Sequence, residues 1–535
     1  MFNYILKNGK VIDGTGNPWF YGDVAIKENR IAEIGMDLKD ESAEIIDVYG
    51  LAVAPGFIDM HTHTELSYLV KPDEECKISQ GVTLEVGGQC ALSPAPVNNE
   101  TRSACEGMNN PLLGVHGLKY EWTTMAEFLD YLDKKPHIIN LATLQGHNTL
   151  RMEAMGFDNR PPSDSELEKM KESLRASFEA GVFGFSSAGV QAPSNFAETQ
   201  ELIELCKVVS EHNGIYETHL RSESNGVLTS VAETLRIAQE SGVKAQIAHH
   251  KAAGKINWGK LNVSLGMINE ARQNGFDVGV DMYPYTYASF NLEALLPPWV
   301  RGNTVEKALE ILADKSNRLR ILRDMQNGIP GSGWESVLLW CGWDGVRIGC
   351  VAKPENRYLE RQSLSQIAIE RGCEPIDALC DILCDEGFGV LMLIDFGSEE
   401  DVETALRYPF MAPVTDALTT HLSGGGNHPR IFGTFTRVLG HYARNKKIMT
   451  IEEAVRRMTS LPASRIGIQD RGLLRKGNYA DITVFNPDTV IDTATMDDPQ
   501  GLSIGIEHVF VNGVHAWKDH KTTGALPGCL LRKAK

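Results

Sequence analysis

Eight short apolar segments between residues 56 and 416 constrain the fold of this chain more than any other feature. Helix-like stretches separate many of them, and one stretch has clear end signals: Ser163 as N-cap, Glu166 three residues later and Gly181 at its end. Strands that alternate with helices predict parallel βαβ units, and eight strands are the number in a TIM-type barrel. We therefore predict an α/β chain with a (β/α)8 barrel whose strands lie at 56–61, 83–88, 138–144, 182–187, 215–219, 245–250, 276–283 and 411–416.

The two ends of the chain follow a different pattern from the middle. Residues 1–54 and 470–535 alternate apolar and polar residues in short pieces, with Asn-Gly and Asn-Pro turns between them. We predict that both ends join in one small β-sandwich domain and that residues 55–469 form the barrel. The stretch at about 290–400, after the seventh barrel strand, is too long for one βα loop. We expect an inserted helical segment there that forms a lid over the barrel mouth.

Composition and charge exclude several classes of function. The 535 residues carry a formal charge of -18, which argues against a nucleic-acid or anionic-membrane partner. The sequence has no apolar run long enough to cross a membrane, and its start does not resemble a signal peptide. Ten scattered cysteines indicate reduced thiols and a cytoplasmic location. A small-molecule substrate is expected, and assembly into a homo-oligomer is left open.

Potential metal ligands follow several of the predicted strands. His61 and His63 stand two residues apart after the first strand, so strand alternation places both imidazoles on one face. The ends of parallel barrel strands meet at one mouth, where active sites of this fold lie. Thiolate and imidazole together suit Zn²⁺. The further candidates at strand ends are Cys90, His219, His249 or His250, and Asp416.

Each candidate also has an ordinary structural interpretation. A lone cysteine at a strand end is more often part of the core, and a lone histidine there more often makes a structural hydrogen bond. Asp416 could be the N-cap of the segment that follows it. Cys380 and Cys384 lie four residues apart on a predicted helix without a partner pair, which favours burial in the core. Coincidence of the whole set at successive strand ends favours a metal site.

The sequence resembles the D-aminoacylase (N-acyl-D-amino-acid deacylase) family of the amidohydrolase superfamily. The resemblance covers nearly the whole chain and rests on GFIDMHTHTE, GQCALSPAP, LQGHNTLR, YETHLRSE, IAHHKAAG, DMYPYT, HPRIFGTFTRVLGHY and ADITVFNP. It implies a distorted barrel, a small β-sandwich and zinc. Cys90 would replace the carboxylated lysine that bridges two metals in many relatives, and VFGFSSAG on the fourth strand indeed contains no lysine.

The same resemblance assigns roles to individual residues. Cys90, His219 and His249 would hold a tight zinc, and His61 and His63 would form a second, weaker site with Cys90. His249 is preferred to His250 because neighbouring strand residues face opposite ways. Asp416 would act as general base and then general acid toward a zinc-activated water and the departing amine. The substrate carboxylate would be bound by Lys251, Tyr283, Ser289 and Arg430.

The implied reaction is therefore hydrolysis of N-acyl-amino acids, with the D configuration following from the resemblance alone. Two departures bear on the substrate: the stretch 189–197 lacks the tyrosine of relatives, and the loop 422–427 is rich in glycine. They suggest an unusual acyl-amino acid or another amide. Alternatives are a dipeptide or cyclic-amide hydrolase such as a hydantoinase, which would want the bridging lysine, and a non-catalytic binding protein on this scaffold.

Overall fold

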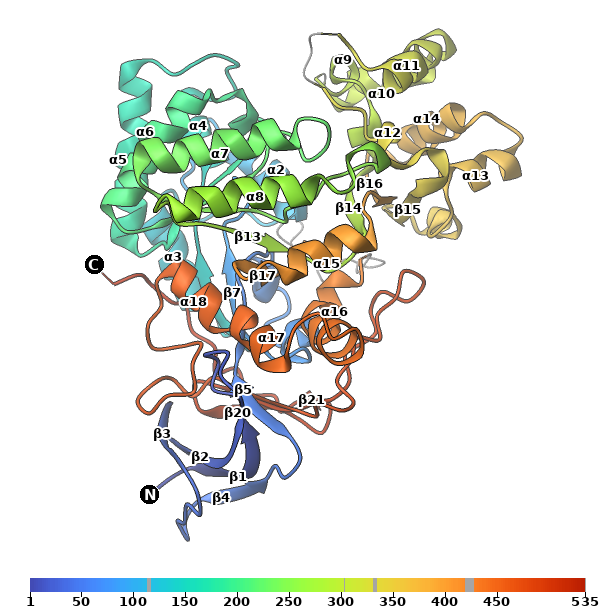
Figure 1. Cartoon of the computed structure of the whole chain (residues 1–535). Helices are drawn as coiled ribbons and strands as arrows, with labels where there is room; N and C mark the ends of the chain where they lie inside the picture. The colour runs from blue at the N-terminus through green and yellow to red at the C-terminus, as the bar shows by residue number, and fades with distance from the viewer. Residues whose placement is uncertain (113–116, 303, 331–333, 419–427, 535) are drawn as a thin grey trace.

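The computed structural model describes residues 1–112, 117–302, 304–330, 334–418 and 428–534 (Figure 1). Parallel strands in its centre coincide with all eight predicted segments. They form two hydrogen-bonded runs, β6-β7-β8 and β9-β10-β11-β12-β13-β17. The bounds are β6 (Phe57–Asp59), β7 (Val82–Gly87), β8 (Asn140–Thr143), β9 (Gln145–Gly146), β10 (Gly184–Ala188), β11 (Ile215–His219), β12 (Lys244–Ile247), β13 (Val278–Met282) and β17 (Met411–Pro413).

Backbone contacts at two points join the runs into a ring. Only Leu144 separates β8 from β9, so these two pieces form one kinked strand. At the other junction, Thr62 and Ala417 make a parallel bridge just beyond β6 and β17. Next to it the Asp416 amide donates to the His61 carbonyl at 3.0 Å, and the His63 amide donates to the Ala417 carbonyl at 2.8 Å. Eight strands thus close a distorted barrel, and its last closure is made by the segments that carry predicted site residues.

Helices pack around this ring and connect its strands. The longest, α5, begins at the predicted N-cap Ser163, whose hydroxyl and Glu166 form a capping box, and it ends at Gly181 in the left-handed conformation. The helices are α1 (Glu75–Ile78), α2 (Arg102–Leu112), α3 (Met125–Asp133), α4 (His147–Met155), α5 (Asp164–Ala180), α6 (Thr199–Glu211), α7 (Val227–Ser241), α8 (Lys260–Gln273), α15 (Glu399–Arg407), α16 (Arg430–Arg437), α17 (Ile451–Met458) and α18 (Ser460–Ile466). None of the helices in the described ranges is both long and apolar enough to cross a bilayer.

Both chain ends contribute to one further sheet, which lies at the bottom of Figure 1. Its edge strand β3 bridges back to Tyr479 just ahead of β18, so the sheet curls and its two halves form the layers of the predicted sandwich. The core enclosed by this curl draws only on residues before 54 and after 470, which supports our proposed domain division. The strands are β1 (Tyr4–Val11), β2 (Phe20–Lys27), β3 (Arg30–Gly35), β4 (Glu44–Asp47), β5 (Ala52–Pro55), β18 (Ile482–Phe485), β19 (Ile506–Val511), β20 (Val514–Lys518) and β21 (Lys521–Thr522).

The insertion after β13 contains strands as well as the predicted helices. An antiparallel sheet, ordered β14-β16-β15, shares a separate apolar core with the helices of the insertion. The strands came from apolar runs such as VRIGCV and VLMLID, which the expectation of a helical segment overlooked. The elements are β14 (Tyr287–Asn291), α9 (Pro298–Arg301), α10 (Val305–Ala313), α11 (Lys315–Asn327), α12 (Leu338–Cys341), β15 (Val346–Val351), α13 (Leu364–Arg371), α14 (Pro375–Glu386) and β16 (Val390–Asp395).

Candidate metal centre

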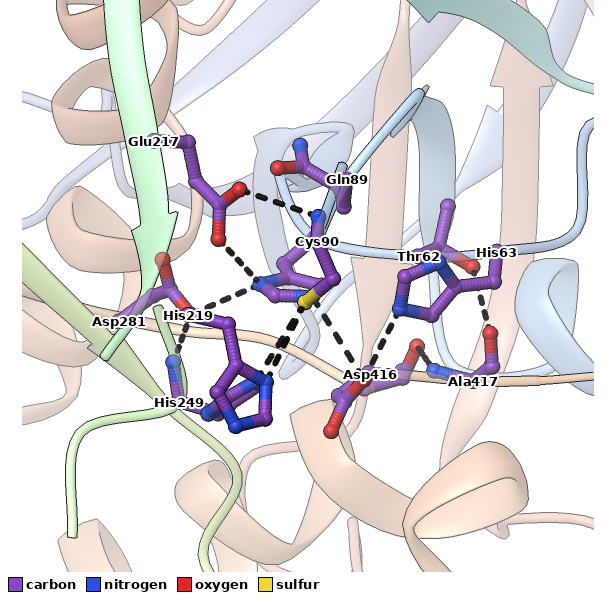
Figure 2. A network of polar contacts seen from close by, with 12 residues as sticks. Thr62, His63, Gln89, Cys90, Glu217, His219, His249, Asp281, Asp416 and Ala417 are labelled. Atoms are coloured by element: carbon purple, nitrogen blue, oxygen red, sulfur yellow. Dashed lines mark hydrogen bonds and ion pairs between the residues drawn. The ribbon is translucent and has the colours of Figure 1, made fainter. Parts of the chain in front are cut away.

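Five predicted ligands meet at the carboxyl-terminal mouth of the barrel (Figure 2). The Cys90 sulfur lies at their centre, 3.5 Å from His61 Nε2, 3.5 Å from His249 Nε2 and 3.8 Å from His219 Nδ1. His63 completes a second group with His61 and Cys90, and in each group the ligand atoms lie within 4.8 Å of one another. Residues from four strand ends, up to 159 positions from Cys90 in the sequence, therefore converge on one thiol.

The spacing of this donor set fits zinc. With Zn–S at about 2.3 Å and Zn–N at about 2.05 Å, a tetrahedral ion separates its sulfur and nitrogen ligands by about 3.5 Å. The distances from the Cys90 sulfur to His249 Nε2 and His219 Nδ1, 3.5 and 3.8 Å, match that separation. Borderline-soft sulfur and imidazole donors also favour zinc over calcium or magnesium, which bind oxygen. The residues present therefore fit a zinc ion held by Cys90, His219 and His249.

A carboxylate contacts the ring nitrogen that faces away from the thiol in three of these histidines. Asp281 lies 3.2 Å from His61 Nδ1, whereas Glu223 lies 2.8 Å from His249 Nδ1 and 3.5 Å from His219 Nε2. Metal-ligating histidines characteristically donate their other N–H to such a group, which fixes the ring and its tautomer. The sequence did not single out Asp281 or Glu223. Both occur in the motifs DMYPYT and YETHLRSE, but their contacts depend on the fold.

Burial sets the protonation of Cys90 and His219. It raises the pKa of Cys90 to about 12, with Glu217 adding to the effect, and it lowers the pKa of His219 to about 3 despite the nearby Glu223 carboxylate. The His219 imidazole is thus already neutral, the form that binds metal. The Cys90 thiol must lose its proton when a cation binds, because the thiolate is the ligand.

The loop that carries Cys90 has a constrained backbone. Cys90 and Ala91 both have positive φ, at 50° and 65°, a conformation that is uncommon outside glycine and needs support from its surroundings. Glu217 accepts from the Cys90 amide at 3.2 Å, and the Ser186 hydroxyl accepts from the Ala91 amide at 3.0 Å. Ser186 lies on β10, the fourth barrel strand. This strand has no lysine, and its Ser186 instead helps to position the Cys90 thiol through the contact with the Ala91 amide.

Asp416 lies within reach of both histidines of the first strand (Figure 2). Its Oδ1 is 3.5 Å from His61 Nε2 and 3.4 Å from His63 Nε2, while its Oδ2 accepts from Arg430 Nη1 at 2.8 Å. Burial alone would raise the pKa of Asp416, but Arg430 and the neighbouring imidazoles hold that pKa well below its usual range. The carboxylate is therefore ionised at neutral pH and can accept a proton.

The predicted carboxylate-binding residues are only partly gathered beside this cluster. Lys251 Nζ donates to Glu223 at 2.5 Å and lies 5.6 Å from the Tyr283 ring, over which the Arg430 guanidinium packs at 4.5 Å. Ser289 lies on β14, opposite Leu393 of the inserted sheet, and among the described residues no hydrogen bond joins its side chain to the cluster. Two cations and a buried phenol thus form one side of the site.

Other sequence candidates fall outside the cluster. His250 turns away and bonds Ser264 through Nε2 at 2.8 Å, as the preference for His249 requires. His147 of the motif LQGHNTLR is fully buried between Ser194 and Glu201, 2.9 Å from each, where it makes structural hydrogen-bond contacts. The stretch 189–197 leaves Val190 exposed. The glycine-rich loop 422–427 lies wholly outside the described residues, within the segment 419–427.

Comparisons of the sequence and of the structure identify the family to which the chain is similar. The amidohydrolase family profile matches residues 44–281 and 414–516, leaving out the insertion. The chain is 35% identical to D-aminoacylase of Alcaligenes xylosoxydans xylosoxydans, over 99% of this chain and 98% of that protein, and 35% identical to N-acyl-D-glutamate deacylase of the same organism, over 99% and 96%. The structure of N-acyl-D-glutamate deacylase from Bordetella bronchiseptica, complexed with zinc and a phosphonate inhibitor, superposes with a TM-score of 0.82 at 31% identity over 99% of both chains.

Proposed function

Because the chain belongs to the D-aminoacylase branch of the amidohydrolase family, we propose that it is a zinc-dependent hydrolase of N-acyl-amino acids. The substrate would be a small molecule with an amide bond and a free carboxylate, and the products would be a carboxylic acid and an amino acid. The observation that carries this proposal is the juxtaposition of Cys90, His219 and His249 with an ionised Asp416 beside His61 and His63. The names of the relatives support the D configuration.

Cys90, His219 and His249 would hold the tight zinc, and Cys90 with His61 and His63 a weaker second one. When bound, zinc supplies a Lewis acid that polarises the amide carbonyl and makes water more acidic. Asp416 takes the proton as water adds to the carbonyl carbon, and it returns this proton to the nitrogen when the C–N bond breaks. Arg430 keeps the Asp416 carboxylate ionised for the first step through its 2.8 Å contact.

Binding of the substrate carboxylate would fall to Lys251, Arg430 and Tyr283, which face one another beside Asp416. Ser289 stays a prediction. Lys251 already pairs with Glu223, and Arg430 with Asp416. The substrate carboxylate must therefore share these two cations with the protein's own carboxylates. The missing tyrosine near Val190 is a reason to expect an unusual acyl group or side chain. We place the protein in the cytoplasm, because ten cysteines scattered along the sequence are typical of reduced thiols.

The acid/base role is tested with Asp416→Asn. Loss of the proton acceptor should lower kcat by about 10²- to 10⁴-fold while zinc content stays at the wild-type level. Asp395→Asn, an exposed aspartate of the inserted sheet, is the matched control and should leave kcat within twofold. Near wild-type turnover by zinc-loaded Asp416→Asn would show that this role is wrong.

The substrate class is tested by a screen of zinc-loaded enzyme. N-acyl-D-amino acids, their L enantiomers, dipeptides and cyclic amides should be compared by kcat/KM. We expect turnover of N-acyl-D-amino acids and at least 100-fold lower kcat/KM for the L series. Faster hydrolysis of hydantoin or dihydropyrimidine would establish the cyclic-amide alternative instead.

A further inference from the structure

The segment that carries His61 and His63 has a second functional face. Its two histidines point toward Cys90 and Asp416, whereas the alternating threonines, Thr62 and Thr64, contact Lys77 and Glu85 on the opposite side. Their hydroxyls lie 2.9 Å apart, and Thr64 Oγ1 donates to Glu85 Oε2 at 3.0 Å. The backbone that positions the histidines is therefore held from behind by a polar network inside the barrel.

Lys77 is the centre of this network. Its ammonium donates to Asp59 Oδ2 at 2.7 Å, to Thr415 Oγ1 at 2.9 Å and, in a very short contact, to Glu85 Oε1. A longer contact of 3.3 Å reaches Thr62 Oγ1. Lys77, Asp59 and Thr415 are almost completely inaccessible to solvent, and charge-assisted hydrogen bonds in such surroundings are strong and directional. The network thus links the first strand to the segment after β17.

Thr415 immediately precedes Asp416, and its hydroxyl has all of its hydrogen-bonding positions occupied. Its hydroxyl donates to Asp59 Oδ2 at 2.5 Å and accepts from Lys77 Nζ and from the Ala417 amide, the latter at 3.2 Å. Its own amide donates to Asp59 Oδ1 at 3.0 Å. A hydroxyl with one donor and two acceptor positions occupied has no hydrogen-bonding capacity left. The residues on either side of Asp416 therefore cannot rotate independently of the network.

This matters because Asp416 has a strained backbone, with φ at +45°. A non-glycine residue keeps such a conformation only where its surroundings determine it. The strain aims the carboxylate at His61 and His63, 3.5 and 3.4 Å away (Figure 2). The contacts of Thr415 with Asp59 and Lys77 hold the main chain on the N-terminal side of Asp416.

We infer that Thr415, fixed by Asp59 and Lys77, is a positioning residue that sets the Asp416 carboxylate against the metal centre. This inference rests on the acid/base role proposed for Asp416. Thr415 touches no reacting atom. It acts by fixing the main chain, and displacement of a catalytic group by about 1 Å can cost about 10²-fold in rate.

The test compares Thr415→Val, which keeps the shape and removes the hydroxyl, with Thr415→Ser, which keeps the hydroxyl. We expect Thr415→Val to lose about 100-fold in kcat with KM and zinc content within twofold of wild type, and Thr415→Ser to restore kcat to within about fivefold. Equal kcat for the two variants would overturn the inference, as would a Thr415→Val enzyme that loses thermal stability but no kcat. If Thr415→Val does not fold, Thr415→Cys, whose thiol is a weak donor, takes its place in the comparison.

A double variant separates this inference from the proposed function. If Thr415 acts through Asp416, adding Thr415→Val to Asp416→Asn should cost no further kcat, because the group it positions is already disabled. A full 100-fold additional loss would contradict the positioning role. Wild-type turnover by Asp416→Asn alone would instead refute the acid/base proposal. If Asp416→Asn is inactive but Thr415→Val is fully active, only the positioning role of Thr415 is refuted.

Discussion

The carboxylate of Glu223 gives the sharpest test of the metal centre, because one side chain serves two predicted ligands. It lies 2.8 Å from His249 Nδ1 and 3.5 Å from His219 Nε2, and it neutralises Lys251 at 2.5 Å. Removing it frees both imidazoles to rotate. It also leaves the Lys251 ammonium unpaired, 2.8 Å from His249 Nδ1, where its charge would oppose a bound cation.

The size of the effect follows from these contacts. Loss of one such partner typically costs 10- to 100-fold in metal affinity. Glu223→Gln keeps one carbonyl that can accept from His249 but loses the charge, so we expect about a tenfold weaker zinc Kd. Glu223→Ala removes both contacts, so we expect about 100-fold, or about 2.8 kcal/mol at about 1.4 kcal/mol per factor of ten.

Zinc affinity is measured by competition with a chelator of known Kd at fixed pH, together with metal content after dialysis. Glu233→Gln is the control: Glu233 pairs with Arg221 and Thr199 in the same region, and within the described ranges its hydrogen bonds reach none of the predicted ligands. Its zinc Kd should therefore stay within twofold of wild type. If Glu223→Gln and Glu223→Ala both bind zinc as tightly as wild type, Glu223 does not orient the ligands and the assignment of His219 and His249 loses its support.

Three further predictions concern single positions. Cys90→Ser should lower zinc affinity at least 100-fold, seen as metal lost on dialysis, because a hydroxyl replaces the thiolate that both ligand groups share; retention of full zinc would contradict this. His250→Gln should keep zinc within twofold because its ring bonds Ser264 instead, so zinc loss would reverse the choice of His249. Burial raises the pKa of Glu65 to about 7. Between the unfolded pKa near 4.5 and this value, the folded protein holds the Glu65 proton more tightly than the unfolded chain does. The free energy of unfolding should therefore fall by roughly 3 kcal/mol as pH rises through this range. Glu65→Gln should remove that fall in urea titrations of the apoprotein at pH 5 and 8, and an unchanged pH dependence would refute it.

The barrel could be predicted from the sequence because its strands are short apolar runs, which differ from the 3.6-residue periodicity of the helices between them. Placing ligands at the ends of these strands needed only the rule that parallel strands share one mouth. This rule therefore predicted His61, Cys90 and His219 as neighbours in space, although they lie far apart in the chain. The predicted strand ends fall within three residues of the observed ones, which was accurate enough for this purpose.

The residues that support the site could not be found in this way. Glu223 and Asp281 act through contacts with residues 26 and 220 positions away, and no local pattern distinguishes them from solvated acids. Lys77 lies in a four-residue helix too short for a clear periodic signal. The inserted strands were missed for a different reason: their partners are each other, so neither the barrel count nor the pattern of the chain ends pointed to them.

The electrostatics of the barrel give an independent reason for a cation at this mouth. Asp59 and Glu85 share Lys77, and Arg430 neutralises Asp416. Glu217 faces only the His61 imidazole among these groups, at 3.6 Å from its Oε1, and that oxygen is buried without a hydrogen-bond partner. Burial raises the pKa of Glu217 to about 8; the His61 imidazole opposes this shift and Asp281 adds to it. Buried carboxylates keep their charge only when it is compensated. Glu217 also accepts from the Cys90 amide, so a divalent ion bound to the thiolate would compensate the very carboxylate that holds the thiol in place.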